Sequence, residues 1–125
     1  LLGGDAGMSG AALLAGTAAL HYGAGRVRVH LLATPEGLAS PAALMLRPAD
    51  ALSMDDKATL VAGCGGGEAI RAHLPRLLSR AVRLVLDADA LNAIAQDQGL
   101  LHLLQQRGQR QLETVLTPHP LEAAR

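Results

Sequence analysis

The chain has very few aromatic residues, a single cysteine and no excess of either charge. Tyr22 is the only aromatic residue in 125, and the 11 basic residues balance the 11 acidic ones. With a single aromatic residue, the chain lacks the usual platforms for stacking nucleic-acid bases. Without a basic excess, it lacks the electrostatic footprint of a nucleic-acid binder. We therefore expect no nucleic-acid partner, and a core built from Leu, Val, Ala and Met.

The number of cysteines and the hydropathy pattern indicate the compartment in which the protein is expected. Cys64 is the only cysteine, so no internal disulfide can form, and a reducing cytoplasm is the simplest expectation. No apolar run approaches the roughly 20 residues that a membrane-spanning helix needs. No signal-peptide pattern is visible either. We expect a cytoplasmic protein with no membrane partner.

Both ends of the sequence resemble the interior of secondary-structure elements. Leu1 and Leu2 run directly into a glycine loop, and residues 121–125 resemble the opening of a helix. We therefore expect residues 1–125 to form a single partial domain, truncated at both ends. A sheet cut in this way leaves unpaired strand edges and exposed apolar helix faces, which favour association. The expected assembly is a homo-oligomer.

Short apolar runs alternate with helical patterns along the chain. Residues 34–57 are expected to form a loop with a short helix and an edge strand. Pro75 lies inside one helical pattern, so we expect a kink or two shorter pieces there. The predicted strands are 1–2, 27–32, 43–46, 59–62, 83–86 and 114–116, and the predicted helices are 9–22, 68–79, 89–95 and 100–106. This alternation predicts an α/β fold with a parallel sheet, whose strand order the sequence leaves open.

Glycine-rich loops follow two of the predicted strands, at 3–10 and 63–67. Ligands of open parallel sheets bind outside the carboxyl ends of the strands, and a following helix N-terminus favours anions. Both loops are therefore candidates for binding a nucleotide or a similar phosphorylated ligand. The first loop is also compatible with a structural turn that Asp5 or Ser9 caps, and the second with a merely flexible loop. Cys64 has no basic neighbour in sequence and is not expected to be a nucleophile.

Polar residues follow the next two strands. Asp87 and Asp89 flank Ala88 after an apolar strand, and such a pair can hold Mg²⁺ through waters or orient a hydroxyl. We favour a site role for Asp87 and a helix-capping role for Asp89. His119 lies between two prolines that restrict the backbone, so we expect a positioned binding group. The other histidines are expected to be surface or packing residues.

Four segments occur in the order of one known family. They are GGDAGMSGAA at 3–12, YGAGRV at 22–27, DADALN at 87–92 and TPHP at 117–120. On these motifs the chain resembles the ADP/ATP-dependent NAD(P)H-hydrate dehydratases of the ribokinase-like superfamily, over essentially its whole length. The resemblance implies a partial, three-layer ribokinase-like fold. It also implies repair of hydrated NADH and NADPH, in which ADP or ATP phosphorylates the hydrate's hydroxyl and elimination of phosphate restores the nicotinamide.

The resemblance implies roles for particular residues. Ala11, Gly67 and His119 would contact the hydrated cofactor, with Asp5 and Asp87 as weaker candidates, and Mg²⁺ would accompany the nucleotide. Two segments depart from the family's pattern. The second loop usually reads Gly-Pro-Gly-Leu-Gly but here is GCGGG at 63–67, and Leu121 stands where the family has glycine.

The nucleotide loop and the catalytic aspartate of that family lie beyond the last motif found here. We therefore expect no catalytic residue and no metal ligand within this chain, and no activity from it alone. Two other interpretations remain open. One is a ribokinase-like kinase that acts on a small molecule such as a vitamin precursor, and the other is a non-catalytic remnant.

Overall fold

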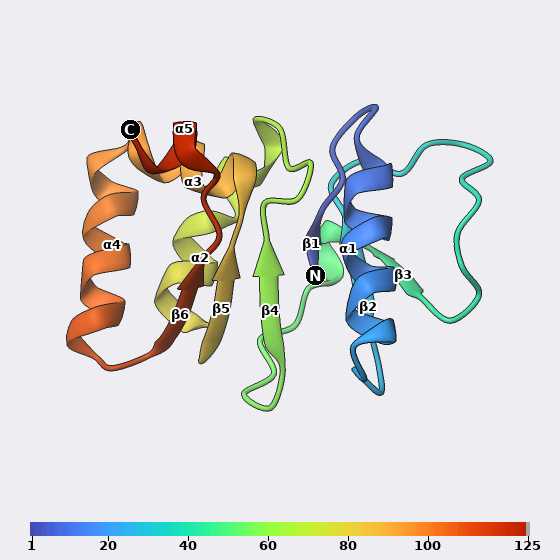
Figure 1. Cartoon of the computed structure of the whole chain (residues 1–125), viewed down its shortest axis with the longest axis horizontal. Coiled ribbons are helices and arrows are strands. Elements are labelled where there is room, and N and C mark those ends of the chain that lie inside the picture. Colours follow the sequence, from blue (N-terminus) through green and yellow to red (C-terminus); the bar gives the residue numbers. More distant parts are fainter. Residues whose placement is uncertain (125) are drawn as a thin grey trace.

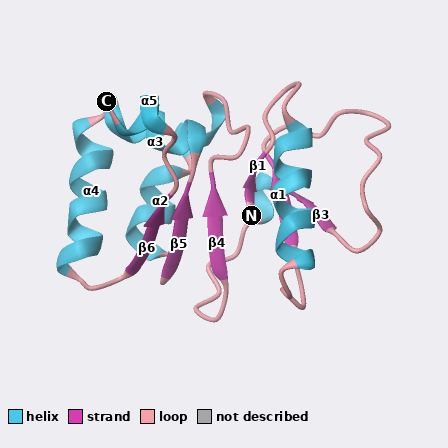
Figure 2. Ribbon diagram, in the orientation of Figure 1, coloured by secondary structure: helices cyan, strands magenta, loops and turns pink. Residues whose placement is uncertain are grey.

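The computed structural model describes residues 1–124 and contains a parallel sheet with helices on both sides (Figures 1 and 2). The strands are β1 (Leu2–Gly3), β2 (Arg28–Leu31), β3 (Met45–Pro48), β4 (Thr59–Ala62), β5 (Arg83–Leu86) and β6 (Glu113–Leu116). The helices are α1 (Ser9–His21), α2 (Leu74–Arg80), α3 (Ala88–Ala95), α4 (Gln98–Gln109) and α5 (Pro120–Ala123), with the 3₁₀ turns η1 (Ala49–Ala51) and η2 (Ala69–Ala72). The predicted α/β class is confirmed, and the architecture is that of a partial ribokinase-like fold.

The strand order is β3-β2-β1-β4-β5-β6, and every neighbouring pair is parallel. From β1 the chain builds the sheet in one direction through β2 and β3, and from β4 it builds in the other direction. Figure 1 shows α1 on the near side of the sheet and α2 on the far side. The order therefore reverses between β1 and β4, and in open α/β sheets the crevice at such a switch point is where ligands bind.

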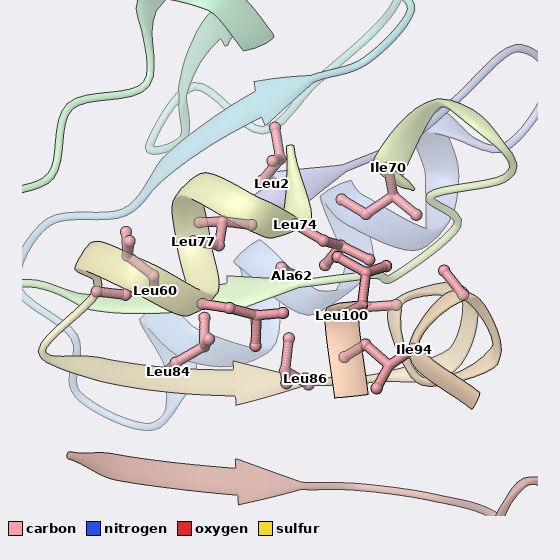
Figure 3. Packing of buried hydrophobic residues seen from close by; sticks show 14 of the residues in the cluster. Leu2, Leu60, Ala62, Ile70, Leu74, Leu77, Leu84, Leu86, Ile94 and Leu100 are labelled. Atoms are coloured by element: carbon pink, nitrogen blue, oxygen red, sulfur yellow. The ribbon is translucent and has the colours of Figure 1, made fainter. Parts of the chain in front are cut away.

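The two faces of the sheet carry separate hydrophobic cores. The larger one joins β4 and β5 to α2, α3 and α4, and includes Leu60, Leu74, Leu84 and Ile94 (Figure 3). The smaller one joins α1 to β2 and includes Ala12, Val29 and Leu31. The successive residues Val29, His30 and Leu31 of β2 are all buried, as expected for a strand that is covered on both faces.

Small residues of α1 allow the helix to lie close to the sheet. Gly16 is buried, and a Cβ atom at this position would lie 2.8 Å from Cγ2 of Val29. Gly23 follows the helix with a positive φ of 96°, as predicted for a left-handed helix end. The prediction that Ser9 caps α1 is wrong, because Met8 occupies the N-cap position and no side chain caps the helix. The first turn is instead closed by a backbone bond from the Ala11 amide to Met8 O.

Other element boundaries follow the sequence with small shifts. The helical pattern around Pro75 is divided into two shorter pieces, η2 and α2, which is one of the two predicted outcomes. The expected edge strand is β3, two residues later than predicted. Gly99 does not separate two helices but lies in the first turn of α4, where Asp97 accepts hydrogen bonds from the Gly99 and Leu100 amides.

A buried arginine ties α4 to the end of α2. The Arg107 side chain is 1% exposed and donates to the carbonyl oxygens of Leu78, Ala81 and Glu113. It also donates to Thr114 Oγ1. Burial, with a smaller contribution from Arg110, lowers the pKa of Arg107 below its ordinary value. The guanidinium therefore satisfies carbonyl groups at the end of α2 that have no partner within the helix.

Replacing this arginine should destabilise the fold. Arg107→Met leaves buried carbonyl oxygens without donors, at about 1–3 kcal/mol for each group. We expect the free energy of unfolding to fall by at least about 3 kcal/mol in urea melts. The control is Arg110→Met, because Arg110 is exposed and its side chain donates to Ser79 O at the surface. Equal losses for the two variants would contradict a special role for Arg107.

Self-association remains a prediction, and the structure indicates which surface to test. Val61, Val85 and Val115 lie side by side in register across β4, β5 and β6. Val115 is 54% exposed, and Figure 1 draws no helix in front of this part of the sheet. We expect Val115→Lys to lower the mass that light scattering measures at high concentration, relative to Glu113→Lys in the same strand. An unmodified chain that stays monomeric at high concentration would contradict the expected oligomer.

Candidate functional site

The two glycine loops meet at the switch point of the sheet. We call residues 3–8 the first glycine loop and residues 63–67 the second. The Gly4 amide donates to Cys64 O over 3.1 Å, and the Asp5 amide donates to Gly65 O over 2.7 Å. These bonds continue the pairing of β1 with β4 past the ends of both strands. The loops are therefore held to each other by backbone, and neither is an independent flexible segment.

Close packing explains the glycines of the second loop. A Cβ atom at Gly65 would lie 2.7 Å from Met8 O, and one at Gly63 would overlap Asp87 O. A Cβ atom at Gly67 would overlap the carboxylate of Asp5. These three glycines also have positive φ angles, which other residues rarely adopt. The sequence left ligand contact or flexibility as explanations, and loop-to-loop packing supplies a third.

Two carboxylates fix the second loop and the turn that follows it. Asp89 Oδ2 accepts a hydrogen bond from the Gly67 amide over 2.9 Å. Asp5 Oδ2 accepts one from the Ala69 amide over 3.4 Å, and its Oδ1 accepts from the Ala6 amide over 2.8 Å. The prediction that Asp89 caps α3 is wrong, because Asp87 is the N-cap residue and the Asp89 side chain bonds to the loop. Asp5 was the other candidate for a capping residue in the first loop. It does not cap α1, and its carboxylate accepts a hydrogen bond at the start of η2 instead.

Asp87 connects the exits of three strands. Its Oδ1 accepts a 2.7 Å bond from the Thr117 hydroxyl, beyond β6. Its Oδ2 accepts from Cys64 Sγ over 3.4 Å, beyond β4. Asp87 itself follows β5. The carboxylate therefore fixes the segment that leads to His119 relative to the second glycine loop, which gives it a positioning role at this edge.

Cys64 is a protonated thiol in this setting. Burial, together with the hydrogen bond and negative charge of Asp87, raises the pKa of Cys64 to about 11. A thiol with a raised pKa is a poor nucleophile at neutral pH. The raised pKa therefore gives a second physical reason, besides the lack of a basic neighbour, to expect that Cys64 is not a nucleophile.

His119 begins α5 and caps it. Its Nδ1 accepts hydrogen bonds from the Leu121 and Glu122 amides, and its own amide donates to Glu122 Oε2. Its Nε2 lies 3.2 Å from Glu122 Oε1, and the His119 side chain is 57% exposed. This is a capping box in which the imidazole replaces the usual hydroxyl or carboxylate. The rigid placement predicted from Pro118 and Pro120 thus has a further cause that the sequence did not suggest.

The predicted site residues occupy one edge of the sheet, and several of them are in contact. Ala11 is exposed, and its Cβ would lie 2.9 Å from a Cβ added at Gly65. Gly67 lies against Asp5, and Asp87 is connected by Thr117 to the segment before His119. A cleft of about 200 Å³ opens beside the second loop, lined by Gly67, Glu68, Arg71, Asp89, Asn92, Ala93 and Gln96.

Some features of the edge were not visible in the sequence. Ala88, between the two aspartates, has a φ of 43°, a left-handed conformation that is strained for alanine. This turn carries the Asp87 and Asp89 side chains to different partners, so they do not act together on one Mg²⁺ ion or one hydroxyl. The Thr117 hydroxyl was also missed, because its partner lies 30 residues away.

Within residues 1–124 no cluster of three His, Cys, Asp or Glu side chains has the arrangement of a metal site. None of the helices in that range is long and apolar enough to cross a membrane.

Comparisons with known proteins agree on one family. The family model for NAD(P)H-hydrate dehydratase matches residues 1–125. The ADP-dependent (S)-NAD(P)H-hydrate dehydratase of Neisseria meningitidis is 40% identical over 133 residues, which cover all of this chain and 44% of that protein. The bifunctional NAD(P)H-hydrate repair enzymes Nnr of Escherichia coli and Coxiella burnetii are each 33% identical, over 24% and 25% of their lengths. The chain thus spans less than half of these relatives. No solved structure matches it.

The raised pKa of Cys64 gives a test of the Asp87 contacts. Asp87→Asn removes the negative charge next to the thiol, so the pKa of Cys64 should fall below about 11. Burial is the larger cause and remains, so we expect the pKa to stay above its ordinary value. The rate of alkylation by iodoacetamide, measured from pH 7 to 11, reports the thiolate fraction. Asp97→Asn, in the cap of α4, is the matched control. An unchanged Cys64 profile in Asp87→Asn would contradict the contact.

The raised pKa of Cys64 also predicts how the stability of the fold changes with pH. Since the thiol binds its proton more tightly in the folded chain, folding is favoured while the thiol stays protonated in both states. That contribution should be lost as pH rises from about 9 through about 11. Cys64→Ser should show less of this loss in urea melts across the same range. An identical pH dependence in both proteins would contradict the assignment.

Proposed function

The chain belongs to the NAD(P)H-hydrate dehydratase family, and on that premise we propose that its paired glycine loops form the substrate-binding side of such an enzyme. The substrate would be hydrated NADH or NADPH. The observation that carries the proposal is the backbone pairing of the two loops at the switch point, where Gly4 and Asp5 donate to Cys64 and Gly65. The position is the one where parallel α/β sheets bind nucleotide ligands.

The geometry suits binding more than chemistry. The loops are pre-organised by their own contacts, so little conformational entropy is lost when a ligand is bound. Ala11 and His119 are exposed at the edge, and Gly67 lacks a side chain that would narrow it. We assign these three residues to contact with the hydrated cofactor. Asp5 and Asp87 hold the loops in place and do not contact the ligand, since their carboxylates already accept hydrogen bonds from the chain.

The phosphoryl donor is proposed from the family alone. The Neisseria relative is an ADP-dependent enzyme, and we propose ADP or ATP as the phosphoryl donor in the reaction proposed here. The donor would transfer a phosphoryl group to the hydrate's hydroxyl, and loss of phosphate would restore the nicotinamide ring. The aspartates of this chain do not form a ready Mg²⁺ pair, because Asp87 bonds to Thr117 and Cys64 while Asp89 bonds to Gly67. No catalytic step is assigned to residues 1–124.

Substitution of His119 tests its contact with substrate. His119→Ala removes both the imidazole and the cap of α5, whereas His119→Asn keeps an N-cap acceptor and removes only the imidazole. A lost ligand hydrogen bond costs about 0.5–1.5 kcal/mol, so both variants should bind hydrated NADH roughly two- to tenfold more weakly. Calorimetric titration of hydrated NADH into the chain measures the dissociation constant, with a melting curve for each variant.

Three outcomes would count against the proposal or its parts. Unaltered binding by His119→Asn, with weakened binding by His119→Ala, would show that His119 acts only as a cap. Equal weakening by His102→Ala, an exposed histidine of α4 that bonds to Gln106, would show that the effect is not specific. Failure of the unmodified chain to bind hydrated NADH at millimolar concentration would contradict substrate binding by the glycine loops.

A further inference from the structure

The cleft beside the second glycine loop is polar, and most of its residues have no part in the proposed contact with substrate. Gly67, Glu68 and Arg71 of η2 line one side, and a single face of α3 lines the other. The residues of that face are Asp89, Asn92, Ala93 and Gln96. Ala93 is the only apolar side chain in the lining, and no aromatic ring is present. The cleft therefore offers charged and hydrogen-bonding groups, and no surface for a nicotinamide or adenine ring.

Gly67 belongs both to this cleft and to the proposed contact with the hydrated cofactor. Its amide donates to Asp89 Oδ2 over 2.9 Å, so the α3 wall of the cleft is fixed to the second loop. A cleft of about 200 Å³ is smaller than the pockets that enclose a whole drug-sized ligand. A dinucleotide that contacts Gly67 therefore has room here for only one of its groups, such as a sugar with its phosphate.

Arg71 is oriented by a neutral partner. Its Nη2 donates to Gln96 Oε1 over 3.0 Å. Its Nε lies 3.7 Å from Glu68 Oε2, but the Glu68 side chain is 93% exposed, and ion pairs in solvent contribute little. Since a guanidinium carries five N–H donors, these two contacts leave donors for a ligand. Arg71 is therefore an oriented cation, and within residues 1–124 its only carboxylate partner is the exposed Glu68.

The cleft contains a partner for each of the two forms of a nucleotide ribose. In α/β proteins that bind dinucleotides, a carboxylate bonds to the ribose 2′-hydroxyl of NAD, and a nearby arginine accommodates the 2′-phosphate of NADP. Here Asp89 has acceptor sites beyond the one that the Gly67 amide occupies. Arg71 has the planar fork that binds a phosphate through two parallel hydrogen bonds.

We propose that this cleft binds the adenosine ribose of the hydrated cofactor, and that Arg71 is a specificity residue that favours the 2′-phosphorylated form, hydrated NADPH. The proposal rests on the proposed function for the identity of the ligand. It adds which end of the ligand lies beyond Gly67 and which of the two forms is preferred. The other end, with the hydrated ring, is assigned to Ala11 and His119.

The test compares two nucleotides that differ only in the 2′-phosphate. The probes are adenosine 2′,5′-bisphosphate and adenosine 5′-monophosphate, each titrated into the chain by calorimetry. We expect the bisphosphate to bind about tenfold more tightly, because its second phosphate accepts charged hydrogen bonds from Arg71. NMR spectra should show amide shifts at Gly67 and Gln96 that saturate with the bisphosphate. Hydrated NADPH and hydrated NADH, titrated in the same way, should differ by a similar factor.

Three variants isolate the role of the guanidinium. Arg71→Gln removes the charge, so the preference for the bisphosphate should disappear. Arg71→Lys restores the charge without the planar fork, and should recover part of the preference. Arg76→Gln, an exposed arginine of α2, also removes one positive charge and should keep the full preference. A melting curve for each variant checks that the fold is retained.

The outcomes separate this proposal from the proposed function. Equal affinities for the two nucleotides, no binding of the bisphosphate at millimolar concentration, or a preference that survives in Arg71→Gln would overturn the proposal. An equal loss in Arg76→Gln would also overturn it, because overall charge would then be the cause. In each of these cases, binding of hydrated NADH would leave the proposed function standing. Binding of the bisphosphate that depends on Arg71, without binding of either hydrated cofactor, would support the cleft and contradict the proposed function.

Discussion

The pairing of two loop backbones at the switch point determines most of what this structure can do. β1 is only two residues long, so its hold on β4 depends on bonds made beyond the strand, from Gly4 and Asp5 to Cys64 and Gly65. These bonds require the two loops to approach more closely than side chains allow, and that requirement accounts for Gly63, Gly65 and Gly67. The glycines are thus a condition of the fold at this edge.

The aspartates of the edge follow from the same constraint. Once the second loop lies against the first, its Gly67 amide is satisfied by the carboxylate of Asp89. Asp87 then joins the exits of β4 and β6 through Cys64 and Thr117. The result is an edge whose polar groups are fixed before any ligand arrives. This pre-organisation is what links the fold to the proposed binding of a hydrated nicotinamide cofactor.

The sequence predicted the elements that depend on local patterns. It did not predict the contacts that depend on a partner far away in the chain. The apolar runs of β4 and β5 and the division at Pro75 were predictable, because strand period and proline geometry act locally. The role of Asp89 was not, since its partner Gly67 is 22 residues away and only the fold brings them together. The strand order was equally hidden, because α/β patterns of the same kind are compatible with several orders. The proline frame of His119 led to the prediction of a positioned group, but the cap that holds its imidazole uses its own Nδ1, which no spacing rule for Ser, Thr, Asp or Asn would indicate.

Residue-resolved amide hydrogen exchange of the ligand-free chain tests the central claim most directly. If the glycine loops are locked to each other, the amides of Gly4, Asp5 and Gly67 should exchange slowly, at rates comparable with the Asp87 amide, which bonds to Ala62 O between β4 and β5. Exchange at Gly4 and Asp5 as fast as at the exposed Gly37 amide would contradict the account, because the loops would then be open segments that only a ligand could order.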